Sequence, residues 1–303
     1  MKKRIISLIT VLLIAATLTA CGGSDDGESK EITFGAKNFT EQFLLAQMGT
    51  IILEENGFNV EERSNLGSTA LRQALENEQV DITFDYTGTG LVTYMGEEPI
   101  ADKQEAYETV NELDQERNGI YWTNLMEVNN TYTIAMKEDR AEELGIVSIA
   151  DLADYVNENP GELRFGTDAE FGNRDDGLPG VEETYGFEFG SDNISEMSYG
   201  LQYDALENDE VDVAMGFETD SRIRELNLVN LEDPEEFFPS YNAALSMTEN
   251  TYENYPEIRE LLQPLTDELD SEIMRELNYQ VDIEERSVND VAREYLEENG
   301  FLE

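Results

Sequence analysis

The sequence predicts a mixed α/β protein made of two similar lobes, because two short motifs occur twice at one spacing. Residues 31–35 (EITFG) return at 162–166 (ELRFG), and residues 74–82 (ALENEQVDI) return at 205–213 (ALENDEVDV). Both pairs of motifs are 131 residues apart. In each copy a short strand ending in glycine leads through a helix to a second β-rich run, which is the connectivity of a parallel sheet.

Helical segments complete this plan. Thr40 opens a predicted helix with apolar residues at helical spacing up to Ile52, and residues 69–75 form another. Leucines at helical spacing between residues 255 and 302 predict a helical tail that packs on the first lobe. We expect residues 31–130 and 241–303 to form lobe I and residues 131–240 to form lobe II, with a hinge where the chain crosses near Asn130 and Tyr241.

The first 21 residues have the pattern of a lipoprotein export signal. A basic start at residues 2–4 is followed by an apolar run over residues 5–20 and then Cys21. The run is shorter than the ~20 residues that span a bilayer comfortably. We expect residues 1–20 to be removed, Cys21 to carry lipid, and residues 21–30 to be a flexible tether. An uncleaved anchor helix is the alternative, and both place the domain outside the cell at the membrane.

The chain is extremely acidic, with 68 Asp and Glu against 19 Lys and Arg and a formal net charge of −49. This charge excludes DNA or RNA as a partner, because the phosphate backbone would be repelled. The acidic residues are spread along the chain and not massed in one tail, which favours a surface adapted to high salt and a halophilic source. A disordered acidic chain is disfavoured by the aromatic content and the regular periodicity.

The residue types present restrict the chemistry. The chain has no histidine, which removes Ser-His-Asp arrangements and the usual zinc sites, and its one cysteine is the predicted lipid site, so no thiol nucleophile remains. We expect no cofactor and no metal. Residues 88–90 (GTG) are too short for a dinucleotide fingerprint and are interpreted as a turn leaving a strand. A carboxylate-dependent cell-surface hydrolase stays open as an alternative.

The fold class also predicts where a ligand binds. In open α/β sheets the ligand lies beyond the carboxyl ends of the strands, so the cleft should be lined by residues 37–40, 85–90, 168–174 and 216–220. The repeat pairs Tyr86 with Phe217, so both lobes can present an aromatic ring to one ligand.

Five segments spread over the chain carry a family resemblance: GAKNFTEQ (35–42), NLGST (65–69), DYTGT (85–89), FFPSYN (237–242) and LNYQVD (277–282). In order and spacing they resemble the glycine betaine/carnitine/choline-binding proteins of osmoprotectant ABC transporters. The resemblance implies a two-lobed type II periplasmic-binding-protein fold that closes on a ligand in the interlobe cleft. It also implies that the protein delivers its ligand to a permease with its ATPase. We expect a monomer without enzymatic activity.

The resemblance further implies the site residues. It places four rings around a trimethylammonium group: Tyr86, Tyr132, Phe217 and Tyr241. It places three residues at the ligand's carboxylate: Lys37, Arg174 and Thr89. Two further candidates are Asn130, where some relatives have an acidic residue, and Tyr203. The family often has Tyr where this chain has Phe217, and Arg164 or Arg222 are alternatives to Arg174.

Physical chemistry agrees with an aromatic site for such a cation. A quaternary ammonium has no N–H to donate, and ring faces attract it by ~0.5–2 kcal/mol each. Glycine betaine is the expected ligand, and carnitine, proline betaine and choline share its quaternary ammonium group; Lys37 favours a ligand with a carboxylate over choline. A receptor for another zwitterion, such as ectoine or an amino acid, is the alternative among binding proteins.

Overall fold

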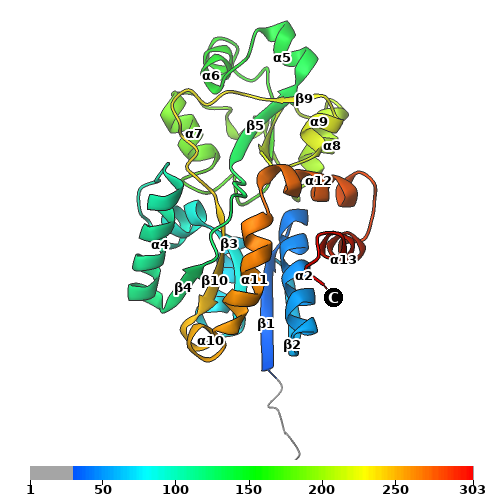
Figure 1. Cartoon of the computed structure of the whole chain (residues 1–303). Helices are drawn as coiled ribbons and strands as arrows, with labels where there is room; N and C mark the ends of the chain where they lie inside the picture. Colours follow the sequence, from blue (N-terminus) through cyan, green and yellow to red (C-terminus); the bar gives the residue numbers. More distant parts are fainter. Residues whose placement is uncertain (1–29, 303) are drawn as a thin grey trace, which may run out of the picture. The chain divides into compact units, whose positions relative to one another are not determined.

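The structure is a computed structural model that describes residues 30–302. The predicted signal peptide, the lipidation site Cys21 and the tether up to residue 29 lie outside these residues. Within residues 30–302, none of the helices combines the length and apolar character needed to cross a membrane. Two five-stranded sheets form the framework of the described chain (Figure 1).

The first sheet has the strand order β2-β1-β3-β10-β4. Strand β3 pairs in parallel with β1 and antiparallel with β10, which also pairs antiparallel with β4. The strands are β1 (Lys30–Lys37), β2 (Phe58–Leu66), β3 (Ile82–Tyr86), β4 (Ile120–Thr123) and β10 (Ala243–Thr248). Every residue of β3 is buried, which fits a central strand covered on both faces.

The second sheet repeats this order as β7-β6-β8-β5-β9. Its strands are β5 (Tyr132–Lys137), β6 (Phe165–Thr167), β7 (Ile194–Glu196), β8 (Val213–Phe217) and β9 (Leu228–Asn230). Strand β6 is parallel to β8, and β5 is antiparallel to β8, as β1 and β10 are to β3 in the first sheet. Strands β3 and β8 begin 131 residues apart, at Ile82 and Val213. The predicted α/β fold with two repeated sheets is confirmed.

Helices connect and cover both sheets. Those before β4 are α2 (Thr40–Glu55), α3 (Ser68–Glu76), the π-helix η1 (Thr89–Tyr94) and α4 (Lys103–Asn118). Those between β5 and β9 are α5 (Glu138–Leu144), α6 (Ile149–Glu158), α7 (Leu178–Tyr185), the 3-10 turn η2 (Ser191–Asn193), α8 (Leu201–Glu207) and α9 (Arg222–Glu225). The tail contains α10 (Glu249–Asn254), α11 (Glu257–Glu268), α12 (Ser271–Asp282) and α13 (Val288–Glu298).

The helical tail returns to the first sheet, as predicted. Helices α11, α12 and α13 all contact α2, the first helix of that sheet (Figure 1). Their apolar faces are buried there, with Leu262, Leu265 and Leu296 fully enclosed. Asp270 and Ser287 cap α12 and α13 by accepting hydrogen bonds from backbone N–H groups of the first turn.

The interpretation of residues 88–90 as a turn is wrong. Gly88 has helical dihedral angles, φ −61° and ψ −43°, and precedes η1, which begins at Thr89. These angles suit any residue, so glycine is required here by packing. A Cβ at Gly88 would lie 2.8 Å from the ring of Tyr241 and 2.9 Å from the carbonyl oxygen of Ser240. The absent side chain lets Tyr241 lie directly against the end of β3.

A buried ion pair joins α3 to α4. Arg72 donates two hydrogen bonds to the carboxylate of Asp114, at 2.6 and 2.5 Å, and the indole of Trp122 donates a third at 2.8 Å. Asp114 is fully buried, whereas Glu76, the second partner of Arg72, is 39% exposed.

We expect Asp114→Ala to lower the free energy of unfolding by about 3–5 kcal/mol, because it leaves the Arg72 charge buried and unpaired. Urea denaturation measures this loss. Glu76→Ala is the matched control: it removes the exposed partner of the same arginine and should cost less than about 1 kcal/mol. Equal losses in the two variants would contradict this account.

Candidate ligand-binding site

One pocket lies where the central strands of both sheets end. Its free volume is about 30 Å³, so the lining side chains nearly fill it in this structure. Strands β1, β3 and β8 end at this pocket with Lys37, Tyr86 and Phe217, and β5 begins there with Tyr132. The full lining is Lys37, Asn38, Phe39, Ser68, Tyr86, Thr89, Asn130, Tyr132, Asp168, Glu170, Arg174, Tyr199, Phe217 and Tyr241.

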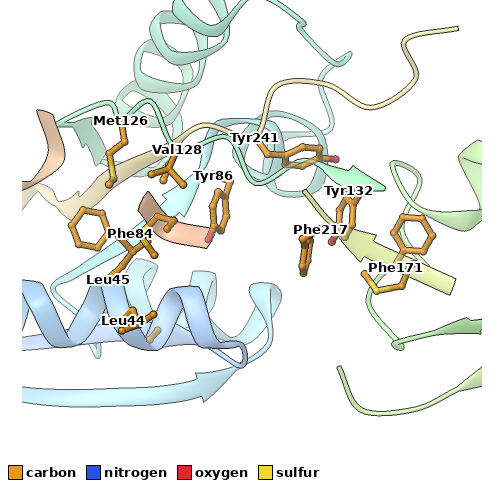
Figure 2. Close-up of a cluster of buried hydrophobic side chains, with 14 of the residues drawn as sticks. Leu44, Leu45, Phe84, Tyr86, Met126, Val128, Tyr132, Phe171, Phe217 and Tyr241 are labelled. Carbon is orange, nitrogen blue, oxygen red and sulfur yellow. The ribbon is translucent and has the colours of Figure 1, made fainter. Parts of the chain in front are cut away.

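Aromatic rings form much of the pocket wall. Figure 2 shows Tyr86 on one side, Tyr132 and Phe217 on the other, and Tyr241 between them. The rings of Tyr132 and Phe217 stack with centroids 4.8 Å apart, and Tyr132 meets Tyr241 edge-on at 5.4 Å. Phe39 continues the wall, with its centroid 5.3 Å from Phe217 and 6.2 Å from Tyr86. Both sheets therefore contribute ring faces to one space.

The two chain crossings between the sheets meet beside this wall. The chain leaves the first sheet through residues 124–131 and returns through residues 231–242. The backbone N–H of Asn130 donates to the carbonyl of Tyr241 at 3.1 Å, and the N–H of Tyr241 donates to the side chain of Asn129 at 2.9 Å. These bonds fix Tyr241 and Asn130 on adjacent segments, although the two residues are far apart in the sequence.

Nearly all residues expected at the site line the pocket. The predicted ring residues, the predicted carboxylate ligands Lys37, Arg174 and Thr89, and the further candidate Asn130 are all among the lining. Tyr203 is not: it is fully buried behind Tyr199, with the two ring centroids 6.4 Å apart. Of the three arginines considered, Arg174 lines the pocket, whereas Arg164 is 45% exposed beside Asp212 and Arg222 pairs with Asp220.

Sequence reasoning missed Phe39 and Tyr199 as wall residues. Phe39 lies in one of the segments expected to line the cleft, but it was not singled out. Tyr199 was detectable from the repeat, because the offset of 131 residues pairs it with Ser68, which also lines the pocket. Ser68 opens α3, and Tyr199 lies just before α8, the helix equivalent to α3 in the second sheet.

Two buried cations lie in the pocket wall, each already paired with a carboxylate. Lys37 is 2.7 Å from Asp85, and its Nζ lies 5.0 Å from the ring centroid of Tyr86. Arg174 donates to Asp176 through Nε and Nη2 and to Glu170 through Nη1. A guanidinium has five N–H donors and an ammonium has three, so both residues keep donors for a ligand.

Two carboxyl groups balance these cations in the lining. Burial acts to raise the pKa of Glu170, but Lys37 and Arg174 outweigh it and hold this pKa below its usual value. Burial raises the pKa of Asp168. Glu170 also accepts a hydrogen bond, at 3.3 Å, from the backbone N–H of Ser68 at the start of α3. The lining thus holds two cations and two carboxyl groups, and Asp85 and Asp176 add two further buried carboxyl groups behind the cations.

A two-sheet α/β fold with a ring-lined pocket at the strand ends has the architecture of a protein that binds a small ligand. Residues 30–298 match the family model described as the substrate-binding domain of ABC-type glycine betaine transport systems. The chain belongs to this family. It is therefore the substrate-binding component of an ABC transporter and not an enzyme, so the hydrolase alternative is wrong. It binds a small ligand outside the cell membrane and works with a permease.

Individual relatives match over nearly the full chain. The chain is 36% identical to a glycine-betaine-binding protein of Pseudomonas aeruginosa, over 96% of each chain. It is 34% identical to a carnitine transport binding protein of Listeria monocytogenes, over 100% of this chain and 99% of the relative. A crystal structure named as a glycine betaine/carnitine/choline ABC transporter superposes with a TM-score of 0.70 at 28% identity, over 90% of this chain and 100% of the other.

We expect Gly88→Ala to lower the melting temperature, because its Cβ would collide with the Tyr241 ring and the Ser240 carbonyl. Overpacking of this kind costs about 1–3 kcal/mol. Gly67→Ala is the control, because its Cβ would meet only Glu170, at 4.0 Å, and it should cost less than about 1 kcal/mol. Calorimetry measures both, and a Gly88→Ala protein that melts like the wild type would show that this contact does not hold Tyr241.

Proposed function

We propose that the protein captures a quaternary-ammonium compatible solute, first of all glycine betaine, and delivers it for osmoprotection. Carnitine, proline betaine and choline are the other members of the ligand class. The observation that carries the proposal is a single pocket with ring faces from both sheets beside two buried cations that keep free donors. The names of the Pseudomonas and Listeria relatives support the same class.

The rings suit the cationic end of such a ligand. A trimethylammonium group is large and weakly hydrated, so it gives up little hydration energy on entering a ring-lined space, and each ring face attracts it by about 0.5–2 kcal/mol. A box of carboxylates would also attract sodium and potassium. We assign Tyr86, Tyr132, Phe217 and Tyr241 to the cation, with Phe39 and Tyr199 closing the same wall.

The buried cations suit the anionic end. Lys37 comes from β1 of the first sheet and Arg174 from the segment after β6 of the second, so a carboxylate bound by both would connect the two sheets. The hydroxyl of Thr89, at the start of η1, is a third donor in this assignment.

Ligand binding would then stabilise a closed state that the permease recognises. We assign residues 31–130 and 241–303 to one lobe, residues 131–240 to the other, and the hinge to the paired crossings at Asn130 and Tyr241. We further propose that the protein acts as a monomer, is anchored by lipid at Cys21, and serves a permease driven by an ATPase.

Tyr132→Ala should raise the dissociation constant for glycine betaine about 10- to 100-fold, because it removes a ring face and opens the pocket wall. Isothermal titration calorimetry in molar salt measures it. Tyr121→Ala is the control, because this ring stacks on Tyr252 outside the pocket lining and should leave affinity unchanged. Folded wild-type protein that binds no trimethylammonium compound but binds ectoine or proline would replace the proposal with the zwitterion receptor.

Lys37→Met should weaken glycine betaine about tenfold or more and leave choline binding intact, because choline has no carboxylate. The same calorimetry gives the ratio of the two affinities. Asp85→Asn in the Lys37→Met background restores charge neutrality, since Asp85 otherwise loses its partner. If betaine and choline weaken equally in both proteins, Lys37 does not bind the carboxylate.

A further inference from the structure

We propose that three buried carboxyl groups behind the pocket, those of Glu41, Asp176 and Asp220, tune the aromatic wall for a cation. Each accepts a hydrogen bond from the hydroxyl of one pocket-lining tyrosine and so makes that ring a stronger cation binder. This inference rests on the proposed function, because it concerns the same wall and the same class of ligand.

A hydrogen bond from a pocket tyrosine hydroxyl to a buried carboxyl group occurs three times. The hydroxyl of Tyr86 donates to Glu41 at 2.6 Å, that of Tyr241 donates to Asp176 at 2.6 Å, and that of Tyr199 donates to Asp220 at 2.5 Å. All three tyrosines line the pocket. The three acceptors are buried, with exposures of 2%, 5% and 5%.

The acceptors come from unrelated parts of the chain. Glu41 lies in the first turn of α2, Asp176 lies between β6 and α7, and Asp220 follows β8. Packing of one local motif therefore does not explain the pattern. In all three cases the ring faces the ligand space and the hydroxyl bonds to a carboxyl group.

The physical effect follows from the strength of these bonds. A hydroxyl that donates to a carboxylate at 2.5–2.7 Å forms a charge-assisted hydrogen bond. The bond shifts electron density from the O–H into the ring, so the ring face becomes more negative. A more negative face binds a cation more strongly, and burial increases the effect because the surroundings screen it weakly.

Of the three carboxyl groups, that of Glu41 gives the clearest test of the inference. Asp176 and Asp220 are neutralised by ion pairs with Arg174 and Arg222. The groups nearest the Glu41 carboxyl are neutral: Tyr86 and, from other elements, Asn130, Thr219 and Asn278. Its Oε2 is buried without a hydrogen-bond partner within residues 30–302.

Such a group destabilises the fold, which argues for a role in binding. Burial raises the pKa of Glu41 despite the hydrogen bond from Tyr86, which lowers it. Its charged form is therefore disfavoured by folding, and the cost is present at pH values above the raised pKa. The charged groups that line the adjoining space are Asp220, Arg222 and Asp282.

Calorimetric titration of the wild type, Glu41→Gln, Tyr86→Phe and the double variant with glycine betaine and choline tests the inference. Glutamine keeps an acceptor oxygen but removes the charge, and phenylalanine keeps the ring but removes the hydroxyl. Glu162→Gln is the matched control, because Glu162 accepts the Tyr155 hydroxyl at 2.8 Å on the exposed surface.

We expect Glu41→Gln to weaken betaine and choline by the same factor, about 5- to 10-fold, because the change acts on the cation shared by both. Tyr86→Phe should lose affinity by a similar factor. The double variant should lose no more affinity than the more strongly affected single variant. Glu162→Gln should bind like the wild type. The melting temperature of Glu41→Gln should stay equal or rise, because glutamine keeps an acceptor oxygen and removes a carboxyl group whose charged form is disfavoured by burial.

The pH dependence gives a second readout. As the pH falls through the raised pKa of Glu41, its charge is lost and wild-type affinity should fall. The Glu41→Gln protein should lack that step while keeping any step due to Asp282 or Asp220.

The inference is overturned if Glu41→Gln binds as tightly as the wild type, if only betaine weakens, or if the losses multiply in the double variant. A Glu41→Gln protein that melts several degrees lower would assign Glu41 a structural role instead. A wild type that binds neither compound would overturn the proposed function itself, before any variant is compared.

Discussion

The site depends first on the hydrogen-bonded contact between the two chain crossings. Asn130 and Tyr241 lie on segments that run in opposite directions between the sheets and bond to each other through the backbone. Because both sheets end at this contact, residues from β1, β3, β5 and β8 reach one pocket. The absent side chain of Gly88 completes the arrangement, since it lets the Tyr241 ring lie against the end of β3.

The distribution of charge differs between the protein as a whole and the pocket. The chain carries a net charge of −49, and such an excess would draw any cation towards the protein. The pocket lining instead pairs Lys37 and Arg174 with carboxyl groups and leaves ring faces as its main open surface. Attraction by net charge is general, whereas attraction by rings favours large cations with little bound water. Selectivity therefore has to come from the pocket wall.

The repeat made much of the fold predictable, because equal spacing of two motifs requires two copies of one strand and helix order. It also predicted the edge where the pocket lies, since ligands bind beyond the carboxyl ends of such strands. The need for glycine at position 88 was not predictable, because its cause is the ring of Tyr241, which is distant in the sequence. Tyr203 was the tyrosine chosen from the sequence, whereas the repeat offset pairs Tyr199 with the pocket residue Ser68; packing buries the Tyr203 ring behind Tyr199.

The role of the carboxyl groups behind the rings could not be predicted from the sequence, for a different reason. With 68 acidic residues in the chain, no spacing of Asp or Glu carries information. Their meaning comes from burial and from the hydroxyl that each one accepts. These bonds also fix the orientation of each tyrosine ring, so the rings need not be ordered when a ligand arrives, and less entropy is lost on binding. Fixed orientation and a more negative ring face come from the same hydrogen bond, which explains why burying a carboxyl group can be tolerated at this place in the fold.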